Sequence, residues 1–324
     1  ELNDPRFKEQ NFQTIEIQPT FDYKKEIWLH HTNNTLQAFK NVLSKLNNEE
    51  AAPLPICVFI NSTDIIYSLM KQLDLLEESA VFCAPKSVDK LKKNRFCNVY
   101  EQWNKDKMKR YNFFTSRFFN AVDMELEEQP HVIMLTDVYF AEHTMIDPYT
   151  DAIQIVGRFR NGVSSITYIS NTKKGLPQRS KEEIKGYLIC SKEIYRTMKN
   201  FYDCATDRAS RDAYRAALES LPFNRMLDRN GNKNWFAIDN YMDEELMKNY
   251  FHDEDSLYKA YDNCDSFIVY HAGHYCPLGD SERLKRENKS QSIKDKRKEI
   301  VRQLEMLGDC VTEMELEYKR DLIA

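Results

Sequence analysis

Two arginines stand two residues apart, behind a glycine, in the segment DAIQIVGRFRNG, which runs from Asp151 to Gly162. A guanidinium group is permanently charged, and its planar set of N–H donors matches the oxygens of a phosphate. Arg158 and Arg160 are therefore candidates for contact with a phosphorylated ligand. The alternative is a basic helix end that faces solvent or forms a surface ion pair.

Small polar residues follow several apolar, strand-like runs. Ser62 ends ICVFINS, and Thr115 and Ser116 follow YNFF. In parallel sheets, ligands gather at the carboxyl ends of the strands. Hydroxyl groups there can cap the next helix, or they can donate hydrogen bonds to phosphates. Lys86 begins a basic segment, KSVDKLKKNR, after another such run. It is a candidate for tracking a nucleic-acid backbone, with a solvated lysine face as the alternative.

The elements that must position these residues alternate between strand and helix. Apolar runs of strand length are separated by segments with helical periodicity, which predicts a parallel sheet covered on both faces, a three-layer α/β domain. Ser62 or Thr63 is the expected N-cap of one helix. The expected strands are residues 12–21, 56–62, 79–85, 111–117, 131–137 and 164–170, and the expected helices are 35–47, 64–75, 87–93 and 151–160.

The pattern changes after the polar loop NTKKGLPQRS, residues 171–180. Long helical periodicity follows, and the only strand-like run is SFIVYHA, which is expected to be buried. We therefore expect an α/β domain over residues 1–175, in which 1–30 is a linker or an edge strand. A mainly helical extension is expected over residues 176–324.

Three segments of the first domain resemble the conserved motifs of superfamily 2 helicases of the DEAD/DEAH-like group. CVFINS (57–62) is similar to motif IV, TSRFFNAVD (115–123) to motif V, and QIVGRFR (154–160) to motif VI, and they occur in the family's order. The resemblance covers residues 50–171, about a third of the chain. It implies a C-terminal RecA-like lobe, the second lobe of a P-loop NTPase motor.

The resemblance also implies roles for residues near a nucleotide. In that family two lobes enclose ATP and Mg²⁺, and arginines of the second lobe stabilise the transferring phosphate. It implies that Arg158 or Arg160 is the arginine finger and that Gln154 contacts the phosphates or the attacking water. Gly157 would let the backbone approach, and Asp123 would face the nucleotide sugar or link to the arginines.

For Ser62, Thr115 and Ser116 the resemblance implies contact with the backbone of DNA or RNA. The chain thus resembles one half of an ATP-dependent helicase or translocase. Its 324 residues contain no G-x-x-x-x-G-K-[ST] phosphate loop, and the Asp-Glu pairs in DEEL (243–246) and DEDS (253–256) are expected to be solvated. We expect an N-terminal RecA-like lobe in cis in the parent protein. Alone, this chain is expected neither to bind ATP tightly nor to hydrolyse it.

Two other functions are compatible with the residues. A non-catalytic nucleic-acid-binding protein would keep the same lobe as a scaffold, and an unrelated α/β domain would use the arginines to hold a small phosphorylated ligand. The absence of an initiator Met indicates a fragment or a processed product. A second basic run, residues 283–302, could line a nucleic-acid channel or serve as a charged linker.

Composition indicates a cytoplasmic protein. No apolar run reaches the length of a membrane helix, and the eight cysteines form no C-x-x-C pair, which predicts reduced thiols. The net charge of −5 restricts any polyanion site to a local patch. Cys264, His271, His274 and Cys276 are zinc-ligand types, but their spacing matches no common finger. Core and turn roles are favoured for them, and no metal site is expected.

Overall fold

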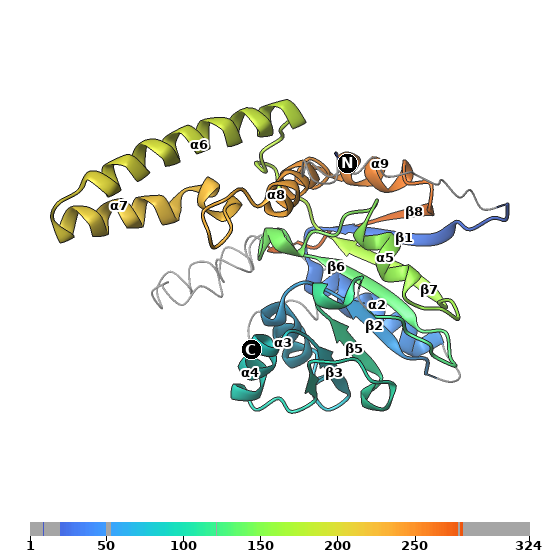
Figure 1. The fold of residues 1–324 in the computed structure, drawn as a ribbon. Helices are drawn as coiled ribbons and strands as arrows, with labels where there is room; N and C mark the ends of the chain where they lie inside the picture. Colours follow the sequence, from blue (N-terminus) through green and yellow to red (C-terminus); the bar gives the residue numbers. More distant parts are fainter. Residues whose placement is uncertain (1–8, 10–19, 50–52, 121, 278, 281–324) are drawn as a thin grey trace. The chain divides into compact units, whose positions relative to one another are not determined.

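The computed structural model describes residue 9 and residues 20–49, 53–120, 122–277 and 279–280. These residues form two compact units, each with its own core (Figure 1). A sheet unit contains residues 23–174 together with the described residues from 253 onward. A helical unit contains residues 175–252, which lie in sequence inside the sheet unit, and the described residues before Tyr23 are grouped with it.

Eight parallel strands form one sheet in the sheet unit, in the order β4-β3-β5-β2-β6-β7-β1-β8. The central strands are buried at almost every position, which explains their continuous apolar runs. The predicted parallel α/β architecture is confirmed, and it is consistent with a RecA-like arrangement. The strands are β1 (Lys25–Thr32), β2 (Ile56–Phe59), β3 (Ser79–Phe82), β4 (Val99–Tyr100), β5 (Tyr111–Phe114), β6 (His131–Thr136), β7 (Ser165–Ser170) and β8 (Phe267–His274).

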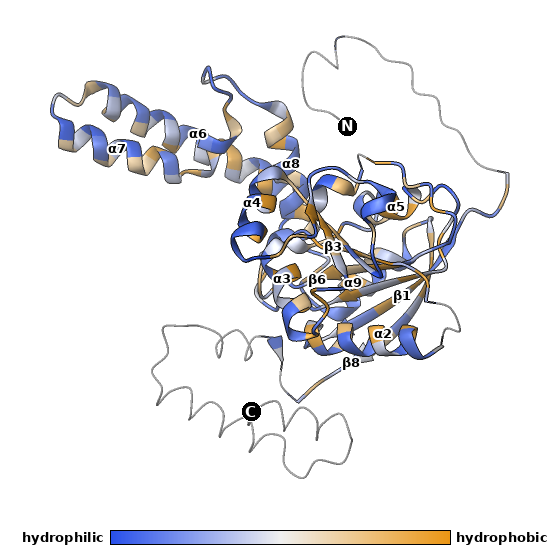
Figure 2. Ribbon diagram, turned by 90° about the horizontal axis from the view of Figure 1, so that it is seen from below, coloured by the Kyte–Doolittle hydropathy of each residue, from blue (hydrophilic) through white to orange (hydrophobic). Residues whose placement is uncertain are grey.

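Helices cover both faces of this sheet. Three of them, α2 (Thr35–Glu49), α3 (Thr63–Gln72) and α4 (Pro85–Lys93), bury one apolar side in a mainly aliphatic cluster with alternate residues of β2, β3, β5 and β6. Figure 2 shows hydrophobic residues concentrated in β3 and β6 and alternating with hydrophilic ones along α2. The predicted N-cap of α3 is confirmed, because the side chain of Ser62 accepts a hydrogen bond from the amide of Ile65.

The other face of the sheet has an aromatic core. The ring of Phe114 stacks between the rings of Phe59 and Phe82, at centroid distances of 5.0 and 4.9 Å. Phe159, just after α5 (Asp151–Gly157), meets the ring of Phe59 edge-on, with centroids 6.1 Å apart. Tyr261 of α9 (Glu254–Asp262) packs on a tyrosine of β7 on this face. The three layers of the prediction are therefore present.

The last two strands of the sheet differ from the sequence prediction. β1 begins within residues 1–30, which were expected to be a linker or an edge strand, but it is paired on both sides, with β7 and with β8. The strand expected at residues 12–21 lies almost wholly outside the described residues. SFIVYHA does form a strand, β8, which pairs with β1 over eight register positions. It is a largely exposed edge strand, so the expectation that it is buried is wrong. The helical unit begins at residue 175, and the described residues from 253 onward belong to the sheet unit instead of a helical extension.

The helical unit contains α6 (Lys181–Cys204), α7 (Arg208–Ser220), a 3₁₀ turn η4 (Pro222–Met226) and α8 (Trp235–Met247). The periodic run at residues 192–221 is divided by Asp207, whose side chain caps the start of α7. A capping box of Ser180 and Glu183 begins α6. A small core of Ile184, Leu188, Phe223, Met226 and Met242 holds these elements together. Among the described residues, every helix is too short or too polar to traverse a bilayer.

The pairing of β8 with β1 is expected to make the protein sensitive to acid. The rings of His30 and His274 stack 4.9 Å apart and share a hydrogen bond of 2.8 Å. Burial, and then the neighbouring His274, lower the pKa of His30 to about 4. In the unfolded chain the pKa of a histidine is near 6.5. As the pH falls, His30 is therefore protonated at a higher pH in the unfolded chain than in the folded one. The stability that neutral His30 contributes to the folded state is therefore fully present above pH 6.5 and is lost as the pH falls toward 4.

We predict that His30→Phe, which keeps a ring in the stack, flattens this loss. The change in slope of unfolding free energy with pH is expected to be below about 1.4 kcal/mol per pH unit, because the ring is partly exposed. Urea unfolding at a series of pH values between 7 and 5 measures it. The control replaces the exposed His143 with phenylalanine. An equal effect of the two substitutions would contradict the prediction.

Candidate functional site

The two arginines predicted from motif VI converge on the aspartate predicted from motif V. Nη2 of Arg160 lies 2.6 Å from Oδ1 of Asp123, and Nη1 of Arg158 lies 3.5 Å from the same oxygen. The two segments are separated by more than 30 residues, so folding is what brings them together. Of the two roles that the resemblance allowed for Asp123, the link to the arginines is the contact that the structure contains.

A short backbone pairing holds these segments in register. The amide of Met124 donates to the carbonyl of Arg158 at 2.8 Å, and the amide of Arg160 donates to the carbonyl of Met124 at 3.2 Å. Met124 and Phe159 form this parallel bridge, and both side chains are buried. Because Phe159 is anchored in the aromatic core, the arginines on either side of it are held beside Asp123.

The other predicted nucleotide-site residues belong to the same cluster. Nη2 of Arg158 donates to Oε1 of Gln154 at 2.7 Å, and its Nε donates to the Gln154 carbonyl at 3.1 Å. The carbonyl of Gly157 accepts a bond from Nη1 of Arg160 at 3.3 Å. A Cβ atom on Gly157 would meet nothing within 4 Å, so the space beside this backbone is open to a ligand.

The charges of the cluster do not cancel. Two guanidinium groups share the single carboxylate of Asp123, which leaves a local excess of one positive charge. The side chains of Arg160 and Asp123 are 50% and 53% exposed, whereas Arg158 is 18% exposed. An ion pair this exposed contributes little to stability. A phosphate could therefore take the place of Asp123 on Arg160 at small cost.

A cavity of about 330 Å³ lies beside Arg160. It is lined by Lys25 at the start of β1, by Phe267 at the start of β8, and by residues around Gly157. Sequence reasoning missed Lys25 because the strand that it begins was not predicted. The adjacent lysines Lys24 and Lys25, directly before the apolar residues of β1, were the available signal.

The predicted nucleic-acid contacts lie at the carboxyl ends of three adjacent strands, β3, β5 and β2. Ser62 and Thr115 are each 8% exposed, and both are used internally. Ser62 caps α3, and the hydroxyl of Thr115 donates to the carbonyl of Phe82 at 3.5 Å. Ser116 and Lys86 are exposed and accessible to a ligand. The helix-capping alternative is thus confirmed for Ser62.

The cysteines and histidines considered as zinc ligands have separate structural contacts. The thiol of Cys264 is buried beside the carbonyl of Pro148, and the amide of Cys276 bonds to the side chain of Asn33. His271 pairs with Glu254 at 3.0 Å. Within the described part of the chain, no three His, Cys, Asp or Glu side chains are grouped as a metal site.

In DEEL the Asp-Glu pair, Asp243 and Glu244, is exposed as expected, whereas the next residue, Glu245, is buried. The side chain of Glu245 is only 8% exposed and forms ion pairs with Arg179 at 3.0 Å and Lys248 at 2.6 Å. In DEDS, Asp253 caps the start of α9. The second basic run, residues 283–302, lies outside the described residues.

No protein-family model, curated protein or solved structure matches this chain. The arginine cluster and the edge of the sheet that carries Lys86 and Ser116 are therefore the two features of the chain that bear on its function.

Proposed function

We propose that this chain is the C-terminal motor lobe, with a helical accessory unit, of an ATP-dependent nucleic-acid helicase or translocase. The observation that carries the proposal is the convergence of Arg158 and Arg160 on Asp123. A link of Asp123 to these arginines is one of the two roles that the resemblance to motifs V and VI implies for it. Two guanidinium groups with one shared carboxylate, next to an open glycine backbone, form a suitable contact for a polyphosphate.

Phosphoryl transfer requires charge stabilisation more than covalent help from the protein. On this proposal the other lobe holds ATP and Mg²⁺, and Arg160 exchanges Asp123 for a phosphate oxygen when the lobes close. Arg158 and Gln154 keep the loop in place during that exchange. The seven cysteines among the described residues form no disulfide, which fits the cytoplasmic location that we propose.

The test is ATP turnover with and without a lobe that carries a phosphate-binding loop. We expect the chain alone to show no turnover. The protein that joins it to such a lobe is expected to hydrolyse ATP, and single-stranded DNA or RNA is expected to accelerate it. Turnover by the isolated chain would contradict the division into two half-sites.

Nucleic-acid binding is predicted at the edge that carries Lys86 and Ser116. Lys86→Ala is expected to weaken binding of an oligonucleotide and to lower the salt dependence of log K by about one phosphate contact. Fluorescence anisotropy at several salt concentrations measures this slope. The control, Lys71→Ala, removes an exposed lysine at the far end of α3. Equal salt-dependence slopes for the Lys86 variant and the unchanged protein would show that Lys86 does not contact the nucleic acid.

A second function is favoured by one observation, namely that both arginines already have partners within the chain. In a non-catalytic nucleic-acid-binding protein, the only role of the cluster would be to hold residues 123–124 against residues 158–160. Asp123→Asn distinguishes the two functions. A structural pin predicts a lower melting temperature and unchanged nucleic-acid binding. A phosphate site predicts altered ATP turnover with a melting temperature close to that of the unchanged protein.

A further inference from the structure

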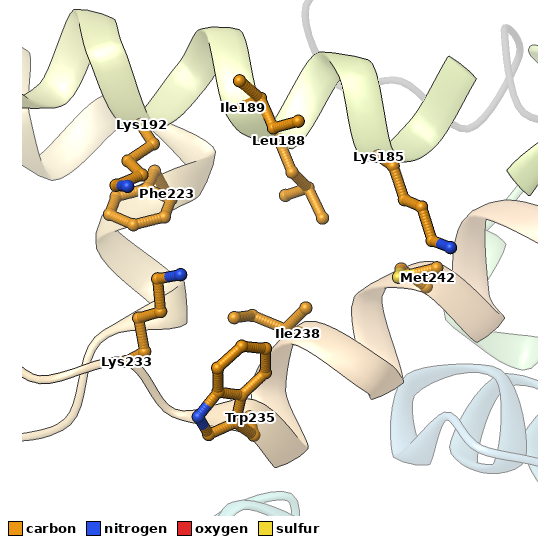
Figure 3. A pocket seen from close by; sticks show the side chains of 9 residues that line it. All are labelled: Lys185, Leu188, Ile189, Lys192, Phe223, Lys233, Trp235, Ile238 and Met242. Carbon is orange, nitrogen blue, oxygen red and sulfur yellow. The ribbon is translucent and has the colours of Figure 1, made fainter. Parts of the chain in front are cut away.

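The helical unit has an apolar groove that its own core does not fill. The groove has a volume of about 270 Å³ and lies between α6 and α8, with Phe223 of η4 at one end. Figure 3 shows Leu188 of α6 and Ile238 of α8 pointing toward each other into it. Trp235 and Met242 continue the α8 wall. The groove is thus lined by the facing sides of two helices.

Helical spacing shows which side of α6 the other described residues leave exposed. Leu188 points into the core with Ile184, one turn earlier. Lys185, Ile189 and Lys192 follow each other at intervals of four and three residues, so they share the neighbouring side of the helix. Ile189 lies between these two lysines along the helix, and its side chain is 63% exposed. Ile189 thus extends the apolar surface of the groove, and contiguous exposed apolar surface is the kind that partners bind.

The groove carries charge of one sign. Its lining contains Lys185, Lys192 and Lys233 and no carboxylate. None of the three lysines forms an ion pair with a described residue, and the ammonium group of Lys233 lies 5.0 Å from the ring centre of Trp235. Figure 3 shows Lys192 and Lys233 at one end of the pocket and Lys185 at the other. Positive charge therefore flanks the apolar strip at both ends.

We propose that this groove binds an acidic amphipathic helix of a protein partner. Apolar side chains of such a helix, at intervals of three and four residues, would enter between α6 and α8, as in other helix-in-groove complexes. Its carboxylates would meet the lysines at the two ends. A fatty acid offers only one terminal carboxylate, whereas lysines stand at both ends of the groove.

Methyl NMR of the full chain, labelled at isoleucine and methionine, tests the proposal. The probe is a synthetic peptide of about four helical turns, with leucines along one side and glutamates on its flanks. We expect it to shift the methyl signals of Ile189, Ile238 and Met242. A peptide in which lysines replace the glutamates is expected to leave them unchanged.

Charge reversal makes the test specific. The triple variant Lys185→Glu, Lys192→Glu and Lys233→Glu is expected to bind the glutamate peptide at least about tenfold more weakly and to gain affinity for the lysine peptide. Ile189→Glu, at an exposed position that tolerates a polar side chain, is expected to abolish binding of the glutamate peptide. Lys199→Glu, elsewhere on α6, is the control and should bind like the unchanged protein.

Three results would overturn the proposal. The first is equal binding of the glutamate and lysine peptides to the unchanged protein. The second is a shift of the same methyl signals by oleate or by oligothymidylate but not by the glutamate peptide. The third is loss of binding in the Lys199→Glu control to the same degree as in the triple variant.

Discussion

Replacement of Arg160 by alanine is expected to lower nucleic-acid-stimulated ATP turnover about 10³- to 10⁵-fold in the two-lobed protein. The effect is large because the guanidinium is expected to meet charge that develops only during phosphoryl transfer. Arg160 is the better candidate for the finger because half of its side chain is exposed and, among the described residues, its one side-chain partner is Asp123. Arg158 is held by Gln154, by Asp123 and by the carbonyl of Asn120.

Alanine substitutions of the two arginines are therefore expected to have different effects. Arg160→Ala should leave the melting temperature unchanged, since its ion pair is exposed. Arg158→Ala should lower both turnover and melting temperature, because it frees the loop that it fastens. Arg160→Lys is expected to restore little turnover, since an ammonium group lacks the planar, bidentate geometry.

The measurement is steady-state ATP hydrolysis with saturating oligonucleotide. The control is Arg196→Ala, which removes an exposed arginine that pairs with Glu193 in the helical unit. If the Arg160→Ala protein kept more than about a tenth of the turnover, the arginine would not stabilise the transition state, given the size of the effect that a finger normally has.

The second large effect is expected on stability. Phe114→Ala should lower the unfolding free energy by about 3–5 kcal/mol, because it removes a fully buried ring from the middle of an aromatic stack. Phe59 and Phe82 would lose their common partner, and Phe59 is also the ring that anchors Phe159. The loss should therefore extend to the position of the arginine cluster.

Urea unfolding monitored by circular dichroism measures this loss, and ATP turnover at a temperature where the variant remains folded reports the effect on the cluster. The matched control is Phe140→Ala, since Phe140 is 40% exposed. If Phe114→Ala lowered the unfolding free energy by less than about 1 kcal/mol, the neighbouring rings would have closed the gap. That result would contradict the close packing on which the position of Phe159 is expected to depend.

The central strands were predictable because both of their faces are buried, which forces continuous apolar runs such as those of β2 and β6. Strands near the two ends of the sheet lack that signal. β1 carries histidines and a tryptophan that is 46% exposed, and β4 has only two residues, so neither produced a clear pattern. β8 was identified as a strand, but only its pairing with β1 shows that the chain returns to the sheet after the helical unit.

For the candidate site, the sequence by itself determined which residue types are present and in what order: two arginines behind a glycine, an aspartate upstream, and hydroxyl groups after buried strands. Only the tertiary structure decided which of them meet. The contact of Asp123 with Arg158 and Arg160 depends on a bridge between Met124 and Phe159, and that bridge depends on a buried aromatic stack. Local spacing cannot encode such a contact, because its stability comes from packing between residues far apart in the chain.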